Sequence, residues 1–353
     1  MKIGRRLIDA GSEPYIIAEI GVNHDGDIDT ALALVDAAAE AGADAVKTQI
    51  FTADLLMSVE ARLAAYQAAA GERDPIEMLR RLELPLDAMD RIIKRAHSRG
   101  MHAIATVFSV DLVDGAARQP WDAFKTASPD IIHQPLIDAL LRTDRPLLLS
   151  TGAADAAEVE RAASWCAGRE VGFFHCVSAY PTPDDDAALA GIRVVGSLVD
   201  APVGYSDHTT SLDTGALAVA AGACMLEKHL TLDRSLPGPD HAASLDPEGF
   251  AAYVQAARRA HRMAGPSHKR PSQVERDVRD ASRQSIVARR DLPAGHVLKA
   301  TDLAIKRPGR GIPPFRLNDL VGCTLRRSVA ADHLLTEAHF DASADQPLES
   351  VAR

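Results

Sequence analysis

Aromatic residues are scarce in this chain, and cysteine is scarcer. Only 4% of the 353 residues are Phe, Trp or Tyr, while 46% are hydrophobic, so a sizeable core must be built mainly from aliphatic side chains. No CxxC pair occurs, which argues against a zinc site or a disulfide scaffold. We therefore expect reduced, core-type thiols at all four cysteines, Cys166, Cys176, Cys224 and Cys323.

An excess of positive charge and long apolar runs are also missing. Asp and Glu outnumber Lys and Arg by 49 to 39, which gives a formal net charge of −10. The chain therefore lacks the excess of basic residues that is typical of nucleic-acid binding. No stretch approaches the roughly 18 apolar residues of a membrane span, and the first residues contain no apolar segment of a secretory signal. We expect a cytoplasmic protein with no nucleic-acid and no membrane partner.

From residue 15 to about residue 246, short apolar runs alternate with amphipathic helical stretches. Strands that alternate with helices predict a parallel sheet, and eight such units predict an α/β fold of the (β/α)8 TIM-barrel type. An open doubly wound sheet is the rival, but no Gly-rich nucleotide fingerprint follows the first run. The runs are 15–20, 44–50, 101–108, 123–127, 146–150, 171–176, 203–205 and 224–229.

Polar residues recur where these runs end. In a barrel the carboxyl ends of the strands meet at one mouth, where barrel enzymes build their sites. Alternation along a strand places Lys47 with Gln49 on one face, and likewise Glu227 with His229. The strand-end residues are Glu19, Lys47, Gln49, Thr106, Lys125, Ser128, Ser150, Ser178, Tyr180, Ser206, His208, Glu227 and His229.

Lysines and hydroxyls at one mouth suit a small phosphorylated anion, because an inward lysine is costly unless an anion or a carboxylate pairs with it. His208 and His229, at the ends of successive strands, are the donor type that a divalent metal prefers. A structural role is the rival interpretation for either histidine alone. Together the residues predict metal-assisted chemistry on a carbonyl or phosphate compound, and they leave aldol, isomerase and phosphatase reactions open.

The composition and the helical pattern of the sequence change after the predicted barrel domain, residues 1–264. Residues 265–282 contain Gly, Pro and Ser with interleaved charges and predict a linker. Residues 283–340 have short apolar pieces with few helical signals, which predicts a small β-rich domain. The last stretch, 341–353, is polar and without periodicity, so we expect it to be disordered.

Several stretches together resemble the sialic acid synthase family. They read IAEIGVNHDG at 17–26, GADAVKTQ at 42–49, FKTAS at 124–128, LSTG at 149–152, HCVSAYPTP at 175–183, GYSDHT at 204–209 and EKH at 227–229. Residues 283–340 resemble the antifreeze-like SAF (β-clip) domain of that family. The resemblance extends over about residues 3–340 in order, and it implies a TIM barrel followed by an SAF domain.

The resemblance implies condensation of phosphoenolpyruvate with an N-acetylated mannose-type sugar, giving a nine-carbon 2-keto-3-deoxy acid and phosphate. It implies a divalent metal, typically Mn²⁺ with Mg²⁺ or Co²⁺ as alternatives, with His208 and His229 as ligands. It also implies a domain-swapped homodimer, in which Arg307 of the small domain reaches the partner's barrel to hold the N-acyl group of the sugar.

The remaining roles are carried over by matching positions. Glu19 would act in proton transfer or in placing water, and Asp130 would be the second catalytic carboxylate. The resemblance implies that phosphoenolpyruvate is held by Lys47, Thr106, Lys125, Ser128, Ser150 and Ser206. It implies that the sugar is bound by Gln49, Ser178, Tyr180, Asp240 and Arg307.

The chain departs from the family pattern at four positions. Thr48 replaces an aromatic residue or His, Pro129 and Asp130 replace Gly-Glu, and Ser178 stands where an Asn is frequent. We predict these changes on the substrate side of the site, where they bear on the choice of sugar.

That choice stays open between N-acetylmannosamine, slightly favoured, and a 2,4-diacetamido-trideoxy hexose leading to legionaminic-type or pseudaminic-type acids. A non-catalytic synthase-like binding protein and an aldolase that does not use phosphoenolpyruvate are the rival functions. The retained lysines and histidines argue against the first. The second leaves the paired lysines and hydroxyls unexplained.

Overall fold

The computed structural model describes residues 1–266 and 268–340. The chain divides into two compact units, Met1–Pro266 and Ser267–Arg353. The predicted disordered tail, 341–353, lies outside the described residues. Within the described ranges, no helix is long and apolar enough to cross a membrane.

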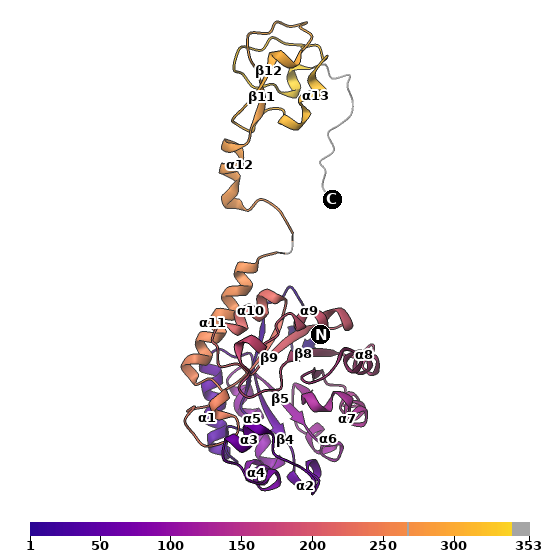
Figure 1. Cartoon of the computed structure of the whole chain (residues 1–353), viewed down its shortest axis with the longest axis vertical. Coiled ribbons are helices and arrows are strands. Elements are labelled where there is room, and N and C mark those ends of the chain that lie inside the picture. Colours follow the sequence, from indigo (N-terminus) through magenta and orange to yellow (C-terminus); the bar gives the residue numbers. More distant parts are fainter. Residues whose placement is uncertain (267, 341–353) are drawn as a thin grey trace. The chain divides into compact units, whose positions relative to one another are not determined.

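Eight parallel strands close into a barrel in the first unit, which confirms the predicted fold class (Figure 1). Around the barrel they follow the order β10, β3, β4, β5, β6, β7, β8, β9. In the register Glu19 pairs with Lys47 on one side and with His229 on the other, so these three residues lie at one level. The strands are β3 Tyr15–Glu19, β4 Ala45–Ile50, β5 His102–Val107, β6 Ala123–Thr126, β7 Leu147–Ser150, β8 Val171–Cys176, β9 Val203–Asp207 and β10 Met225–His229.

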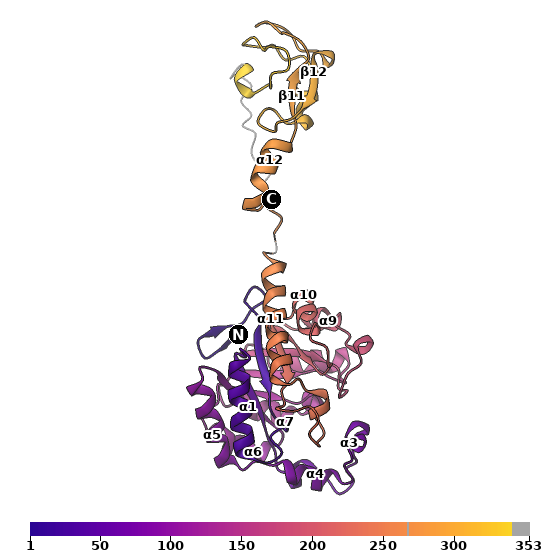
Figure 2. The same ribbon diagram turned by 90° about the vertical axis from the view of Figure 1, so that its left-hand side faces the viewer.

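Helices cover the outside of the barrel (Figures 1 and 2). The first begins where the Asp27 side chain accepts hydrogen bonds from the N–H groups of Asp29 and Thr30, and the chain turns away at Gly42, whose φ is +87°. The covering helices are α1 Ile28–Glu40, α5 Leu86–Ser98, α6 Val110–Ala117, α7 Gln134–Leu141, α8 Ala156–Trp165, α9 Gly191–Leu198, α10 Thr214–Ala221 and α11 Pro247–Ala264.

The interior of the barrel is sorted into an apolar lower layer and a polar upper layer. An antiparallel hairpin, β1 Lys2–Ile3 with β2 Arg6–Leu7, which the sequence analysis did not predict, adds Ile3 and Ile8 to the lower layer. Two residues further along most strands the inward side chains are polar. The charged groups of the barrel interior therefore lie at the mouth, above the apolar lower layer. The strand residues of the lower layer are Tyr15, Ile17, Ala45, Ile104, Ala123, Leu148, Phe174 and Met225.

The connection between β4 and α5 is long and carries three short helices, α2 Ala53–Leu56, α3 Ala65–Ala69 and α4 Pro75–Leu82. Both views show these helices near the end of the barrel opposite the amino-terminal hairpin (Figures 1 and 2). Met78 and Leu82 of α4 form an apolar cluster with Val22 and Phe51, and Leu56 of α2 packs against it. This cluster is separate from the core between strands and outer helices.

The second unit is small and has its own apolar core, built around residues such as Ile286, Leu303 and Leu335. Its regular sheet is limited to β11 Ser285–Ala288 and β12 Leu303–Lys306, and isolated bridges join further segments. It also contains α13 Leu317–Leu320.

One element of this unit differs from the sequence analysis. Helix α12 Arg276–Ser282 lies inside the range predicted as a linker. None of its residues is buried, so the sequence offers no apolar stripe from which to predict a helix.

Candidate active site

One pocket of about 460 Å³ opens at the carboxyl ends of the barrel strands. The structure brings every predicted site residue of the first unit into its lining, from Glu19 on β3 to Asp240 beyond β10. Arg307 belongs to the second unit, where it is exposed just beyond β12. The lining contains Glu19, Lys47, Gln49, Thr106, Lys125, Ser128, Asp130, Ser150, Ser178, Tyr180, Ser206, His208, His229 and Asp240.

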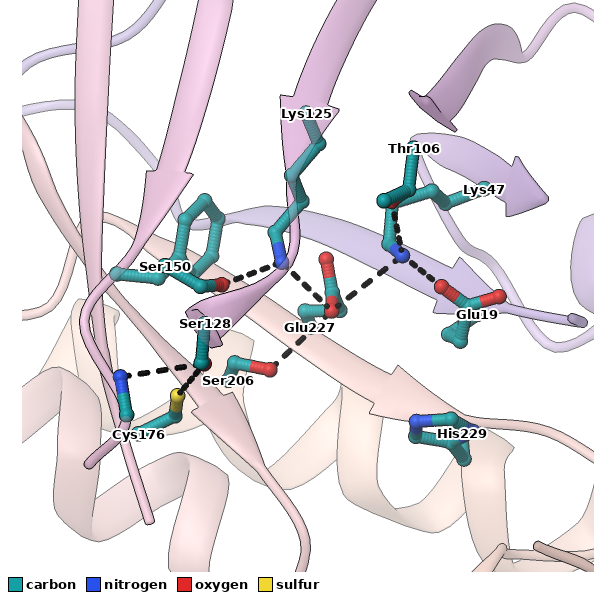
Figure 3. Close-up of polar contacts among 12 residues, drawn as sticks. Glu19, Lys47, Thr106, Lys125, Ser128, Ser150, Cys176, Ser206, Glu227 and His229 are labelled. Carbon is teal, nitrogen blue, oxygen red and sulfur yellow. Dashed lines mark hydrogen bonds and ion pairs between the residues drawn. The ribbon is translucent and has the colours of Figure 1, made fainter. Parts of the chain in front are cut away.

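Two buried lysines meet at a single carboxylate oxygen on the floor of this pocket (Figure 3). Oε1 of Glu227 lies 3.3 Å from Nζ of Lys125 and 3.7 Å from Nζ of Lys47. The hydroxyl of Ser206 donates to the same oxygen over 3.2 Å. Three donors therefore converge on this one oxygen, which partly neutralises the charge of both ammonium groups.

Glu227 was left without a role in the sequence analysis, although strand alternation had put it on the face of His229. Burial alone would raise its pKa, but Lys125 and Lys47 outweigh burial and hold the pKa of the carboxyl below its usual value. Burial conversely lowers the pKa of Lys47, and Glu227 opposes that change.

Glu19 completes the floor on the side of Lys47. Its carboxylate pairs with Nζ of Lys47 and also accepts a hydrogen bond of 2.6 Å from the N–H of Gly21. Nζ of Lys47 donates in addition to the hydroxyl of Thr106 over 3.0 Å. The carboxylate of Glu19 is only 1% exposed and is paired with Lys47. It can therefore accept a proton in a site from which most water is excluded.

A cradle of small polar groups lies beside Lys125. Nζ of Lys125 donates to the hydroxyl of Ser150 over 2.5 Å, and the N–H of Gly152 donates to the hydroxyl of Ser128 over 3.1 Å. The thiol of Cys176 lies 3.1 Å from that hydroxyl. A Cβ atom on Gly152 would come within 2.7 Å of Ser128 Oγ and of Cys176 Sγ, so the cradle closes only around a glycine.

The two histidines converge with their ring centroids 5.7 Å apart. Nδ1 of His208 donates to the carbonyl of Val177 over 2.7 Å, so Nε2 of the neutral ring carries a lone pair, and it lies 3.4 Å from the hydroxyl of Ser206. Nδ1 of His229 is buried and has no hydrogen-bond partner. Burial lowers the pKa of His208 to about 4 and that of His229 well below its usual value, so both rings are neutral at pH 7.

Neutral imidazoles in which one ring nitrogen carries a lone pair fit the donor set of a divalent metal. In the described part of the chain, no group of three or more His, Cys, Asp or Glu side chains has the arrangement of a metal site. A metal here would thus take His208 and His229 and keep positions open for water and substrate, as catalytic sites do.

Two carboxyl groups at the edge of the pocket have raised pKa values because they are buried. Burial raises the pKa of Asp240 to about 7 and that of Asp130, in the 3-10 turn Ser128–Ile132, to about 6. Oδ2 of Asp130 has no hydrogen-bond partner, and Oδ2 of Asp240 lies 3.8 Å from Nδ1 of His229. Each can carry a proton near neutral pH and donate it to a ligand.

One of the four departures from the family pattern was misplaced in the sequence analysis. Pro129, Asp130 and Ser178 line the pocket as expected, but Thr48 does not. It is 1% exposed and alternates with Lys47 and Gln49, so it points away from the barrel interior. Thr48 therefore has no contact with the substrate side.

The fold and site together define a barrel enzyme whose mouth is lined by lysines and hydroxyls, followed by a small second domain. Residues 34–269 match the model of the NeuB family and residues 283–341 match that of the SAF domain. The chain belongs to the NeuB family. This confirms the resemblance seen in the sequence, and the chain is a transferase of the nonulosonic acid synthase class.

Named relatives support this assignment over almost the whole chain. An N,N'-diacetyllegionaminic acid synthase of Legionella pneumophila is 38% identical over 93% of this chain and 95% of its own length. The N-acetylneuraminate-9-phosphate synthase of Homo sapiens is 30% identical, covering 94% of each chain. The solved N-acetylneuraminic acid synthetase of Leptospira borgpetersenii is 30% identical with a TM-score of 0.73, over 79% of this chain and 94% of that chain.

Proposed function

We propose that this enzyme condenses phosphoenolpyruvate with an open-chain, N-acylated mannose-type amino sugar and water, releasing phosphate and a nonulosonic acid. The observation that carries the proposal is the pair of buried lysines, Lys47 and Lys125, meeting at one point within a ring of hydroxyls. Each lysine already pairs with a carboxylate of the floor, and the hydroxyls beside the lysines add neutral donors for the oxygen atoms of a small phosphorylated anion. The names of these relatives agree with this reaction class.

Phosphoenolpyruvate occupies the floor in this proposal. Lys47 and Lys125 pair with its phosphate and carboxylate, and the small groups around Gly152 receive the remaining oxygens. This arrangement fixes the enol carbon toward the open side of the pocket, where the acceptor enters. Holding both reactants in one buried pocket supplies orientation that free solution lacks.

The reaction proceeds by attack of carbon 3 of phosphoenolpyruvate on the aldehyde carbon of the sugar. A carbon–carbon bond forms, the aldehyde oxygen takes a proton, and carbon 2 gains cationic character. Water adds to carbon 2 and gives its proton to Glu19, and the tetrahedral product then loses phosphate to form the ketone. Asp130, whose pKa burial raises to about 6, is the proposed proton donor to the oxygen atoms that gain charge.

His208 and His229 would hold the divalent metal, and we propose Mn²⁺, with Mg²⁺ and Co²⁺ as alternatives. When bound, the metal supplies Lewis-acid polarisation of the aldehyde oxygen. Tyr180 packs beside this pair, with its ring centroid 4.2 Å from that of His208, and helps to fix the ring that binds. Gln49 is held by the carbonyl of Gly21 over 2.9 Å and faces the sugar.

The reaction is tested by phosphate release. With divalent metal present, the full-length protein should release phosphate from phosphoenolpyruvate only when an N-acylated mannose-type sugar is added. Lys125→Met should abolish release, because the anion loses a buried partner. Absence of release with N-acetylmannosamine and with 2,4-diacetamido-2,4,6-trideoxymannose would refute the proposed function.

The metal assignment is tested by direct binding. His208→Ala and His229→Ala should each weaken Mn²⁺ binding, measured by calorimetry or by the electron paramagnetic resonance signal of free Mn²⁺. His175→Ala removes a histidine outside the pocket lining and serves as the matched control. Mn²⁺ affinity of the wild-type level in either pocket variant would remove that residue from the metal site.

We further propose that the enzyme acts as a domain-swapped homodimer in which the exposed Arg307 serves the barrel of the partner chain. Mixed dimers of a Glu19→Ala chain and an Arg307→Ala chain should regain part of the activity, since one barrel then has both residues. No recovery in dimers verified to be mixed would count against the swap.

A further inference from the structure

A buried thiol contacts the hydroxyl of Ser128, and the proposed reaction gives this thiol no role. Cys176 ends strand β8 and is only 4% exposed, whereas Ser128 lines the pocket. Sγ of Cys176 lies 3.1 Å from Oγ of Ser128, and the N–H of Gly152 meets the same oxygen over 3.1 Å (Figure 3). Two groups of the protein therefore contact one hydroxyl of the pocket lining.

The thiol of Cys176 keeps its hydrogen at neutral pH. Burial raises the pKa of the thiol above its usual value, and hydrogen bonding with Ser128 and Gly152 opposes this change only in part. The charges that act on it are Lys125, which lowers the pKa, and Glu227, which raises it. A protonated sulfur can donate one hydrogen bond, whereas a thiolate could only accept.

The direction of the contact between Cys176 and Ser128 decides what Ser128 can offer to a ligand. A serine hydroxyl has one hydrogen to donate and two lone pairs that accept, and the N–H of Gly152 already fills one lone pair. If the thiol donates, it fills the second lone pair, and the hydroxyl hydrogen of Ser128 is available to the pocket. If Ser128 donates to the sulfur, its hydrogen is engaged there and a lone pair faces the ligand.

Two other hydroxyls of the pocket show which direction the floor uses. Nζ of Lys125 donates to the hydroxyl of Ser150, and Nζ of Lys47 donates to that of Thr106. An ammonium group can only donate, so both hydroxyls accept from the protein and have their own hydrogens available for a ligand. A thiol that donates gives the third hydroxyl of this set, Ser128, the same arrangement.

We propose that Cys176 is a positioning residue for phosphoenolpyruvate, because its S–H donates to Ser128 and keeps the Ser128 hydrogen available for an oxygen atom of the anion. The oxygen atoms of an ionised phosphate or carboxylate accept hydrogen bonds, so they attract an O–H and repel a lone pair. The proposal rests on the proposed function, from which the anion in the cradle is taken. Cys176 acts through Ser128 and needs no covalent contact with the substrate.

Steady-state kinetics of the full-length enzyme, with phosphoenolpyruvate as the varied substrate, tests this role. Cys176→Ala removes the donor and should raise the KM for phosphoenolpyruvate about 3- to 10-fold, the usual effect of one hydrogen bond. The kcat and the KM for the sugar should change by less than about 2-fold, because the loss concerns binding of the anion. Cys176→Ser restores a donor and should bring the KM back to within about 2-fold of wild type. An unchanged KM in Cys176→Ala, or no recovery in Cys176→Ser, overturns the proposal.

Cys224→Ala is the matched control for the loss of a buried thiol. Cys224 is 4% exposed, as Cys176 is, but it belongs to the apolar lower layer and its S–H donates to the carbonyl of Val203. The control should leave the KM for phosphoenolpyruvate unchanged, although it too removes a buried hydrogen bond. An equal rise of the KM in this control would make the effect a general consequence of lost packing and would contradict the proposal.

A double-mutant cycle locates the effect at Ser128. Ser128→Ala should raise the KM for phosphoenolpyruvate about 10-fold or more, because a hydrogen bond to a charged group is lost. Adding Cys176→Ala to that variant should change the KM by less than about 2-fold, because the thiol then has no hydroxyl to orient. Effects that add would show that the thiol acts at another place, which would exclude the proposed role.

Calorimetric titration of phosphoenolpyruvate into the full-length protein gives a readout that does not require turnover. The Kd should rise about 3- to 10-fold in Cys176→Ala and recover in Cys176→Ser. Equal Kd values in wild type and Cys176→Ala overturn the role of the thiol, whether or not phosphate is released. The expected Kd pattern without phosphate release from any sugar overturns the proposed reaction and leaves the positioning role standing. Absence of binding to the wild-type protein overturns both.

Discussion

Removal of one charge behind the active site should destabilise the barrel more than removal of two. Lys228 and Asp207 pair in register on β10 and β9, each next to a proposed metal ligand. Their Nζ and Oδ2 atoms are 3.1 Å apart, and both side chains are fully buried. Lys228 also donates to the carbonyl of Thr209 and lies over the ring of Tyr253, 5.4 Å from its centroid.

The magnitude follows from what each substitution leaves behind. Lys228→Met leaves the carboxylate of Asp207 without its countercharge, which costs about 3–5 kcal/mol when a buried pair is broken from one side. The double variant Asp207→Asn, Lys228→Met removes both charges and keeps an acceptor for the N–H of Thr209, which now donates to Asp207 over 2.9 Å. Its free energy of unfolding should therefore lie within about 1–2 kcal/mol of wild type.

The fluorescence of tryptophan reports on this unit alone, since both tryptophans of the chain, Trp121 and Trp165, lie in the barrel. Thermal unfolding followed at these residues should show Lys228→Met melting on the order of 10 °C below wild type. The double variant should recover most of that shift. A single variant as stable as wild type, or a double variant no better than the single, would refute the reasoning.

Three further outcomes follow from other contacts. Gly152→Ala places a methyl group against Ser178 and the anion cradle, and should raise the KM for phosphoenolpyruvate at least about 10-fold in steady-state kinetics, by analogy with other misplaced binding groups. In the second unit the hydrogen bond from His296 holds the pKa of Asp302 well below its usual range, so stability is present above about pH 4 and is lost as the pH falls further. Calorimetry from pH 6 to pH 3 should show that unit losing about 1 kcal/mol, and Asp302→Asn should flatten this dependence; a wild-type profile in the variant would exclude the carboxyl. Thr48→Val should leave the relative kcat/KM values for different sugars unchanged, because the side chain points away from the pocket, and an altered preference would contradict that placement.

The sequence predicted the barrel well because each strand carries two signals at once. Alternation identified the strands, and polar residues at their carboxyl ends identified the mouth, as Lys47 and Lys125 illustrate. What alternation cannot supply is which strand ends meet across the barrel, since that depends on closure and register. Glu227 was put on the correct face but was recognised as the meeting point of the lysines only in the structure.

Short elements escaped the sequence analysis for a different reason. Strands of two residues, such as Lys2–Ile3, and helices of four to eight residues between β4 and α5 are too short for a periodic pattern to emerge. Tyr66 belongs to such a helix, and its contact with Tyr180 is long-range. Thr48 shows the opposite error, because a departure from a family pattern was taken as a sign of contact with substrate.

The packed lower layer of the barrel has a kinetic consequence. Among the described residues, Ile3, Ile8 and Tyr15 are at most 1% exposed and fill the end of the barrel away from the mouth, which closes that end to ligands. In the proposed reaction, a sugar that binds on the open side of phosphoenolpyruvate would cover the path to the lysines. Phosphoenolpyruvate must then bind first and the sugar second. The closed end of the barrel thus imposes a compulsory order of substrate binding.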